Sequence, residues 1–210
     1  MSFAEPEPDR DGVDLWWVEP AGADADAEAA RRGLVTARRI HQLRRPLPLP
    51  ATLDRMGAAL PTRPFRPDHD DAAWLATNAA AFASHPDQGR WTAADLAARR
   101  AESWFDPEDF LVHEIDGRLA GFCWTKLHPA GGDDPAMGEI FVIGVHPDVA
   151  GRGLGRALTA AGLRSLWTRH RTPVGMLYVE ATNERARGLY ASMGFEHHHD
   201  RVAYRRTRAG

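Results

Sequence analysis

The sequence predicts an α/β (α+β) protein, and three observations indicate this class. After residue 60, short apolar runs alternate with segments of helical periodicity. The run "FLVHEIDGRLAGFCWTKL" contains two strand-like halves joined at Asp116-Gly117, a dipeptide that favours a hairpin turn. The apolar run "GEIFVIGV" leads into the glycine-rich segment "VAGRGLGRALTAAGL", in which leucine and alanine recur at helical spacing.

The N-terminal part of the chain contains few predicted elements. Residues 1–12 are polar and proline-bearing, and we expect them to be disordered. A short strand at 13–18, a helix within 21–34 and a strand within 36–47 follow. Prolines punctuate residues 44–67 and predict a linker, so we expect the chain to divide there.

The second part of the chain is denser in predicted elements. Helices are expected over 70–86 and 92–105, because Asp70 and Thr92 are suitable N-caps. The later elements, in chain order, are two strands within 110–127, a buried strand at 138–145, a helix after the glycine-rich segment, a strand at 175–181, a helix within 183–195 that ends at a C-cap-like Gly194, and a strand at 200–206.

Composition excludes several classes of protein. A hydrophobic fraction of 43% is sufficient for a packed core, and no run of 18 apolar residues predicts a membrane span. The formal net charge of −3 gives no general electrostatic reason to expect nucleic-acid binding. The acidic start "MSFAEPEPDRDG" lacks the apolar core of a signal peptide, and the single cysteine excludes an internal disulfide. We therefore expect a cytoplasmic protein.

The glycine-rich segment is the strongest chemical signal in the sequence. Its glycines at 151, 153 and 155 stand at a helix start, where unpaired N–H groups and a partial positive charge favour a phosphate. The P-loop pattern is excluded, because it requires Gly-Lys-Ser/Thr, whereas Gly153 and Gly155 are followed by Leu154 and Arg156. The dinucleotide fingerprint is excluded because the spacing is GxGxG rather than GxGxxG. A turn shaped only for packing remains the alternative.

The part "AGRGLG" resembles the loop Q/R-x-x-G-x-G/A of the GNAT acetyltransferases, whose backbone amides hold the pyrophosphate of acetyl-CoA. Ala150 departs from the pattern, because Gln or Arg is usual there. The segment from Asn183 through Tyr190 to Phe195 resembles the family's Asn…Leu-Tyr…Gly-Phe pattern. Gly144 interrupts the preceding strand and indicates a bulge or a close backbone approach. The resemblance implies the GNAT fold, with a mixed central sheet flanked by helices.

Residues 62–210 further resemble the C-terminal, catalytic domain of the mycothiol synthase family of GNAT proteins. The stretches that carry this resemblance are "AFASHPDQGRWTAADL", "ESWFDPEDFLV", "GFCWTK", "GEIFVIGVHP" and "MLYVEATN". Residues 13–50 resemble only the end of that family's N-terminal GNAT domain. The resemblance therefore implies that residues 1–55 are a remnant of that domain plus a linker, a partial second GNAT unit. The apolar residues 15–17 of the remnant need cover, so self-association of an otherwise monomeric protein is one expectation.

The resemblance implies an acetyl-CoA-dependent acyltransferase that acetylates the cysteinyl amine of desacetylmycothiol (cysteinyl glucosaminyl-inositol) to give mycothiol and CoA. An α-amine titrates near pH 8, so removing its proton at pH 7 costs only about 1.4 kcal/mol, and we expect positioning to contribute more. Glu139 matches the family's substrate-contacting glutamate and base, and Tyr190 matches the residue that protonates the departing thiolate. From the residues alone, a solvated carboxylate at a strand end and a core tyrosine would be the default interpretations.

Further residues match binding positions of the family. Asp87, Lys126 and Tyr178 match positions that contact the sugar, the inositol or the cysteinyl group, although Glu is commoner than Asp at position 87. The residues alone also allow a turn residue, a solvated strand end and a core side chain at these positions. The co-substrate acetyl-CoA is expected against a larger set, which consists of Ile143, Gly144, Val145, Ala150, Gly151, Arg152, Gly153, Leu154, Gly155, Arg156, Asn183, Glu184, Arg185, Ala186, Arg187 and Gly188.

Two other features predict no chemistry. The run His197, His198 and His199 has no spacing that brings the three side chains onto one metal ion, so we expect no metal. Cys123 lies inside an apolar strand and is expected to be a small buried residue rather than a nucleophile.

Two alternative functions stay open at this point. The first is a GNAT N-acetyltransferase that acts on another small amine or on a protein N-terminus. The second, from a different class, is a protein that binds acetyl-CoA without turning it over, which the departure at Ala150 favours. As partners we expect a small-molecule substrate, desacetylmycothiol, and neither a nucleic acid nor a membrane.

Overall fold

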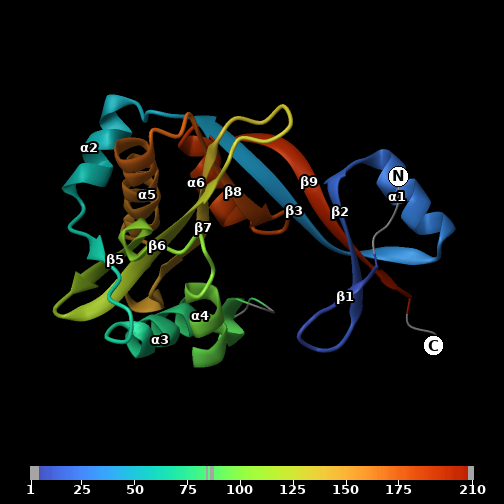
Figure 1. Cartoon of the computed structure of the whole chain (residues 1–210), viewed down its shortest axis with the longest axis horizontal. Coiled ribbons are helices and arrows are strands. Elements are labelled where there is room, and N and C mark those ends of the chain that lie inside the picture. The colour runs from blue at the N-terminus through green and yellow to red at the C-terminus, as the bar shows by residue number, and fades with distance from the viewer. Residues whose placement is uncertain (1–4, 84, 86–87, 208–210) are drawn as a thin grey trace. The chain divides into compact units, whose positions relative to one another are not determined.

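The structure, a computed structural model, describes residues 5–83, 85 and 88–207 of the chain (Figure 1). Strands and helices alternate along these residues, and the predicted α/β class is confirmed. Most predicted elements lie where the residue patterns place them. The helices predicted over 70–86 and 92–105 end earlier, at Ala81 and Arg100, and the last strand begins earlier, at Glu196. Two larger differences are described below.

The chain divides into two compact units. The terminal unit consists of Met1–Arg44 and Leu177–Gly210, and the central unit consists of Arg45–Met176. This division falls at other positions than the predicted domain boundary between residues 55 and 62. The assignment of residues 62–210 to a catalytic domain stays a prediction.

The terminal unit contains strands from both ends of the sequence. Strand β9 lies between β2 and β3 and pairs antiparallel with both of them (Figure 1). The elements that lie wholly or mostly in this unit are β1 (Glu7–Pro8), β2 (Asp14–Ala21), α1 (Ala23–Arg31), β3 (Leu34–Pro46), β8 (Val174–Glu180), α6 (Glu184–Ser192) and β9 (Glu196–Arg206). The predicted strand–helix–strand near the N-terminus is therefore confirmed, and β9 completes its sheet.

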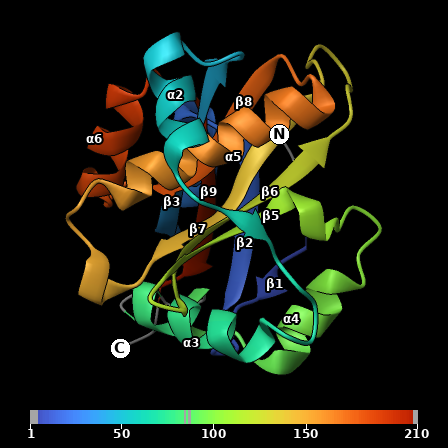
Figure 2. The same cartoon turned by 90° about the vertical axis from the view of Figure 1, so that its left-hand side faces the viewer.

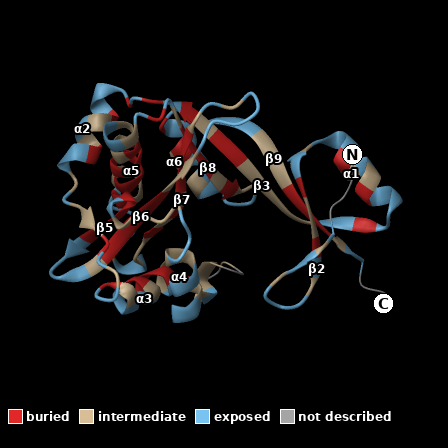
Figure 3. Cartoon of the chain, viewed as in Figure 1, coloured by how far each residue is buried: buried red, intermediate tan, exposed pale blue. Residues whose placement is uncertain are grey.

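Helix α1 covers the apolar side chains of this sheet. Acidic residues stand in its first turn and Arg31 in its last, an order that complements the helix dipole. Its buried Ala25 and Ala29 belong to one core cluster with residues of β2 and β9 (Figure 3). Trp16 and Trp17 are half-buried, and the guanidinium groups of Arg206 and Arg201 lie over their rings, 5.6 Å and 4.6 Å from the centroids. The same chain thus supplies the cover that residues 15–17 require.

The first difference from the sequence prediction concerns residues 1–12. Within this segment, β1 pairs antiparallel with β2, so the prediction of disorder is wrong at Glu7–Pro8. The side chain of Asp9 closes the intervening turn, because it accepts hydrogen bonds from the N–H groups of Asp11 and Val13 at 2.9 Å and 2.8 Å. Such a turn stabilises a hairpin without any hydrophobic periodicity, which explains why the pattern did not predict it.

The central unit contains an antiparallel sheet in the strand order β4-β5-β6-β7. The hairpin predicted at Asp116-Gly117 joins β5 and β6, and both turn residues have positive φ angles of 50° and 73°. The helices and strands of this unit are α2 (Ala51–Ala59), β4 (Arg63–Pro64), α3 (Asp71–Ala81), α4 (Ala93–Arg100), β5 (Phe110–Ile115), β6 (Arg118–His128), β7 (Met137–Val145) and α5 (Leu154–His170).

Helices cover both faces of this sheet. Helix α5 packs on one face of β6 and β7, where its Gly162 leaves room for the side chain of Cys123. Helix α3 lies on the other face, and its fully buried Trp74 is the centre of an aromatic cluster. The rings of Phe110 and Trp124 stack in that cluster with centroids 4.5 Å apart. The two faces therefore differ, since one is shaped by small residues and the other by large aromatic ones.

The second difference concerns the predicted linker, which contains helix α2 packed against α5 (Figure 2). Pro50 stands at its N-cap and Pro61 follows its end, so the helix occupies the interval between two prolines. Its buried Leu53 and Gly57 face the core. The linker prediction was wrong here because the prolines mark the ends of the helix and not its absence.

We expect Gly57→Ala to destabilise the fold. A Cβ at Gly57 would lie 2.7 Å from the backbone carbon and oxygen of Ala160, so α2 would have to move away from α5. Overpacking of this kind costs about 1–3 kcal/mol of the free energy of unfolding. Urea denaturation measures the change.

Gly188→Ala is the matched control for this prediction. Gly188 lies in the interior of α6 and a Cβ there would meet open space. The same substitution should stabilise the fold by up to about 1 kcal/mol, because alanine has the higher helix propensity. Equal effects of the two substitutions would contradict the close contact between α2 and α5.

Candidate functional site

The glycine-rich segment joins β7 to α5 as predicted. A 3-10 turn at Pro147–Val149 follows the strand, and Gly153 is the N-cap of the helix. Gly151 and Gly153 have φ angles of 83° and 79°, which L side chains rarely adopt. The first hydrogen bond of the helix runs from the N–H of Ala157 to the carbonyl oxygen of Gly153. The N–H groups before this bond have no intrahelical acceptor, so this end of α5 can bind an anion.

The surroundings of the segment suit a ligand with a phosphate and an apolar arm. Ala150 and the glycines at 151 and 153 are exposed, and the segment also contributes Arg152 and Arg156 as cations. A cavity of about 420 Å³ lies beside it, with Met56 and Leu60 of the α2 region among its lining residues. A backbone cradle, positive charge and an apolar cavity thus occur together.

Gly144 marks a close approach rather than a bulge. A Cβ there would lie 2.7 Å from the ring of Phe122 on β6. The bulge lies three residues earlier, because Val142 pairs with Trp124 and Ile140 pairs with Thr125, which leaves Phe141 as the extra residue. Since a bulge shifts the alternation of side chains by one position, it decides which face the residues before it occupy.

The bulge places Glu139 on β7 directly opposite Lys126 on β6. Glu139 is buried, with 9% of its side chain exposed, and its Oε2 is hydrogen-bonded to Nε2 of His128 at 2.7 Å. The interpretation of Glu139 as a solvated carboxylate is therefore wrong. A buried carboxylate with one bonded oxygen has its other oxygen available for a substrate proton.

Lys126 is held by aromatic rings. Its Nζ lies 4.7 Å from the ring centroid of Trp104 and 5.8 Å from that of Phe141. Contacts of this kind orient an ammonium group and restrict its motion. Lys126 is half-buried, so it is not a freely solvated strand end.

Tyr178 on β8 belongs to a polar network of the terminal unit. Its hydroxyl accepts a hydrogen bond from Nε2 of Gln42 at 2.8 Å and donates one to Oε1 of Glu19 at 2.5 Å. Nε2 of His199 lies 2.7 Å from the same carboxylate oxygen. Tyr178 is half-buried and polar in its contacts, which differs from the core side chain that the residue type alone allowed.

Helix α6 carries the other predicted residues of the terminal unit. The side chain of Asn183 caps it by accepting a hydrogen bond from the N–H of Ala186 at 3.1 Å. Tyr190 is buried, and its ring centroid lies 5.7 Å from that of Phe195. The ring of Tyr190 therefore has a packing role. Among the residues of the cofactor set that precede it, Glu184, Arg185, Arg187 and Gly188 are exposed.

The predicted site residues are found in both units. Lys126, Glu139 and the glycine-rich segment belong to the central unit, and Tyr178, the residues 183–188 and Tyr190 belong to the terminal unit. Asp87 lies outside the described residues. Sequence reasoning missed His128, Glu19 and Gln42. The first of them had a detectable signal, because it stands two positions after Lys126 on a strand and such residues share a face.

The structure bears differently on the predictions for Cys123 and for the run His197–His199. Cys123 is buried as predicted, and burial raises the pKa of its thiol to about 12, which makes it a poor nucleophile. His197 and His199 have different partners, Asp200 and Glu19, so the side chains of the run do not point at one common position. His197, however, meets His41 from another strand, which the spacing within the run could not show.

No helix within the described residues is long and apolar enough to cross a membrane.

Comparisons with known proteins agree with the geometry of the glycine-rich segment. The family model described as "Acetyltransferase (GNAT) family" matches residues 71–195. A curated protein named mycothiol acetyltransferase from Frankia alni is 48% identical over 198 residues, which cover 90% of this chain and 59% of that protein. Another of that name from Rhodococcus jostii is 50% identical over 197 residues, covering 91% of this chain and 64% of that protein. The chain thus spans about three-fifths of the length of these relatives.

Solved structures show the same fold at low sequence identity. A GCN5-related N-acetyltransferase from Sphaerobacter thermophilus matches with a TM-score of 0.69 at 22% identity, covering 91% of this chain and 58% of that chain. A tandem GNAT protein from the clavulanic acid biosynthesis pathway matches with a TM-score of 0.56 at 19% identity, covering 88% of this chain and 58% of that chain. The predicted fold, a mixed sheet flanked by helices, is therefore confirmed.

Proposed function

Because the chain belongs to the GNAT acetyltransferase family, we propose that it transfers the acetyl group of acetyl-CoA to the cysteinyl amine of desacetylmycothiol. One observation carries the choice of acceptor: the chain is 46–50% identical to curated proteins named mycothiol acetyltransferase. Similarity at this level over about nine-tenths of the chain includes the glycine-rich segment and both strands that carry Lys126 and Glu139.

The cofactor proposal rests on the start of α5. The N–H groups of residues 151–156 would bind the pyrophosphate of acetyl-CoA, and the positive end of the helix would offset its charge. The exposed glycines let the phosphates approach the backbone closely. Ile143 and Val145, at the end of β7, and the exposed start of α6 would contact the pantetheine arm.

We expect Gly153→Ala to weaken acetyl-CoA binding. A Cβ at this position meets no protein atom within 4 Å, so it would project into the space that the phosphates need. Loss of one N–H bond to a charged phosphate costs about 1.5–3 kcal/mol, or about 10- to 100-fold in the KM for acetyl-CoA. Steady-state kinetics at saturating amine measures this change.

Gly132→Ala is the control, because Gly132 also has a positive φ, of 58°, and open space around it. It imposes the same kind of backbone strain at a loop outside the glycine-rich segment. An equal rise in KM in both variants would mean that strain, and not the phosphate contact, causes the effect.

The proposed reaction is a direct transfer. The neutral amine attacks the thioester carbonyl carbon, the C–S bond breaks, and the amide product and CoA form. Glu139 accepts the proton that the amine loses, and Tyr190 donates a proton to the departing sulfur. The burial of Glu139 and its bond to His128 support the first role, because they hold the carboxylate in one orientation.

The acceptor contains hydroxyl groups and an amine, and we propose three side chains for their recognition. Lys126 would donate from a fixed ammonium position, and Tyr178 would contact the acceptor through its hydroxyl. Asp87 completes the proposed set. Glu19 and Gln42, the partners of Tyr178, would set the direction of that hydroxyl.

An assay of the purified chain tests the proposal. Acetyl-CoA is offered with desacetylmycothiol, with other small amines such as glucosamine, and with peptides that have free N-termini. Products are followed by mass spectrometry, because the thiol of the acceptor would interfere with a thiol reagent for CoA. N-acetylation of desacetylmycothiol is expected.

Two other outcomes would replace the proposal. Acetylation of peptides or other amines alone would assign the chain to a different acceptor within the family. Calorimetric binding of acetyl-CoA without any acetylated product would assign it to binding proteins instead.

A further inference from the structure

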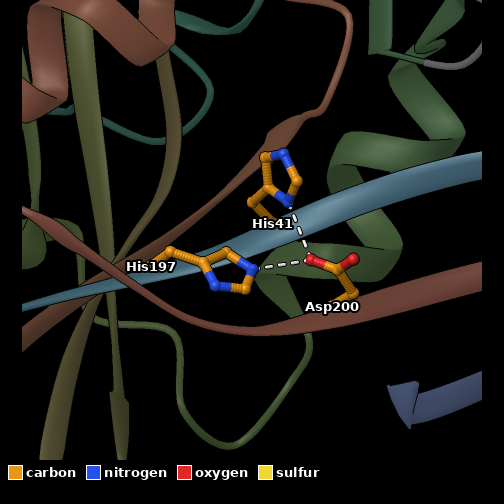
Figure 4. Close-up of side chains that lie close together, drawn as sticks. All are labelled: His41, His197 and Asp200. Carbon is orange, nitrogen blue, oxygen red and sulfur yellow. Dashed lines mark hydrogen bonds and ion pairs between the residues drawn. The ribbon is translucent and has the colours of Figure 1, made fainter. Parts of the chain in front are cut away.

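Three side chains of the terminal unit bring metal-binding atoms together (Figure 4). Nδ1 of His41 on β3 and Nε2 of His197 on β9 each lie 2.7 Å from Oδ1 of Asp200 on β9. The ligand atoms of all three residues lie within 4.8 Å of one another. Figure 4 shows both imidazole rings directed at the same carboxylate oxygen.

A bulge in β9 produces this arrangement. His41 pairs directly with Asp200, Gln42 pairs with His199, and Leu43 pairs with His197, so His198 is an extra residue. In a regular strand, residues three positions apart lie on opposite faces. The extra residue shifts the alternation, so His197 and Asp200 reach the same face and His41 joins them across the pair of strands.

Arg39 holds the carboxylate of Asp200 so that its other oxygen is directed at the two imidazoles. Nη1 of Arg39 lies 2.7 Å from Oδ2 of Asp200, and Nη2 of Arg39 lies 2.9 Å from both carboxylate oxygens of Asp26. Burial alone would raise the pKa of Asp200, but hydrogen bonds from Arg39, His197 and His41 outweigh it and hold the pKa well below its usual value. The carboxylate is therefore an anion with a fixed Oδ1.

The cluster borders a cavity that leaves room for a further ligand. Its volume is about 630 Å³, and its lining includes all three residues of the cluster together with Glu184 and Arg187 of α6. His41 and Asp200 are largely buried, with 17% and 15% of their side chains exposed, while His197 is 52% exposed at the edge. A metal ion here would have three protein ligands and an open side for water.

We propose that His41, His197 and Asp200 bind a divalent transition-metal ion, with the chemistry of Zn²⁺. Two imidazole nitrogens and one carboxylate oxygen are a common zinc donor set, with bond lengths of about 2.0–2.2 Å. Tetrahedral bonds of that length place the ligand atoms about 3.3 Å apart. The observed separations, from 2.7 Å to less than 4.8 Å, bracket this value, so small side-chain movements suffice. The site revises the expectation of no metal, and its test by metal binding does not require that the proposed acetyl transfer takes place.

Titration with Co²⁺ tests the site. The full chain is used without a histidine tag and is first treated with a chelator. Bound Co²⁺ absorbs visible light, and Zn²⁺ then displaces it in competition. We expect one equivalent to bind to the unchanged chain. His197→Gln should lower the affinity by at least about tenfold, and His41→Gln should do the same.

His198→Gln is the matched control, because His198 belongs to the same run and is exposed, yet it is not one of the three ligands. Its affinity for Co²⁺ should equal that of the unchanged chain. His197 is half exposed, so its replacement leaves the fold intact, and circular dichroism checks this. Absence of a Co²⁺ band and of bound Zn²⁺, or equal affinity in all variants, would overturn the proposal.

Discussion

Replacing Glu139 by Gln should lower kcat/KM for the amine acceptor by about 10²-fold near pH 7, as for loss of a general base. Glutamine keeps the size of the side chain and a hydrogen-bonding partner for His128, so packing at this buried position is retained. The loss should be largest at low pH, where the neutral amine is scarce. At higher pH the solvent removes the amine proton, and the defect should shrink.

The measurement is a pH–rate profile of the variant and the unchanged enzyme with both substrates. We expect the KM for the amine acceptor to increase and the KM for acetyl-CoA to stay unchanged. Glu102→Gln serves as the control, since Glu102 is a 49% exposed side chain just after α4 and should leave the profile unchanged. A defect of the same size at every pH would exclude Glu139 as the proton acceptor and leave it a role in positioning.

Replacing Tyr190 by Phe should lower kcat by about 10²-fold with little change in the affinity for acetyl-CoA. The substitution removes the proton donor for the departing sulfur. It keeps the ring that packs edge-on against Phe195, so the fold should be retained. The two catalytic substitutions thus differ in kind, because one acts on the acceptor side and the other on the thiol side.

Tyr204→Phe is the matched control for this second substitution. The hydroxyl of Tyr204 donates a hydrogen bond to Asp26 at 2.6 Å, and only 1% of the residue is exposed. Its loss should lower stability and leave kcat unchanged. An unchanged kcat in Tyr190→Phe, under conditions where chemistry limits the rate, would remove tyrosine from the mechanism and leave thiolate protonation to water.

The elements with strong local signals could be predicted from the sequence. The dipeptide Asp116-Gly117 has the left-handed backbone of a two-residue hairpin turn and pairs Ile115 with Arg118, before a bulge shifts the register between Glu114 and His113. Helix α5 followed from the helical spacing of Leu154, Leu158 and Ala161 after the glycines. Helix α2 and strand β1 were missed, because each depends on contacts or turn bonds that hydrophobic periodicity does not describe.

The candidate site was predicted residue by residue but not in its contacts. Glu139 and Lys126 could be identified by resemblance, whereas their direct pairing depends on the bulge at Phe141. The three-residue cluster that contains His41 depends in the same way on the bulge at His198. A one-residue insertion in a strand reverses the faces of every residue before it, and the nearly continuous apolar run of β7 has no alternation in which such a shift could be seen.

The position of β9 has a consequence for synthesis of the protein. Strands β2 and β3 are made well before their shared partner, because β9 begins at Glu196 and β3 already ends at Pro46. Until β9 is made, both strands have unpaired edges, and Trp16 and Trp17 lack the cover of Arg206 and Arg201. The terminal unit therefore closes only after β9 has been made, and pairings of such high contact order form slowly. Unpaired strand edges of this kind are a template for pairing with another chain, so this interval is the stage at which aggregation competes with folding.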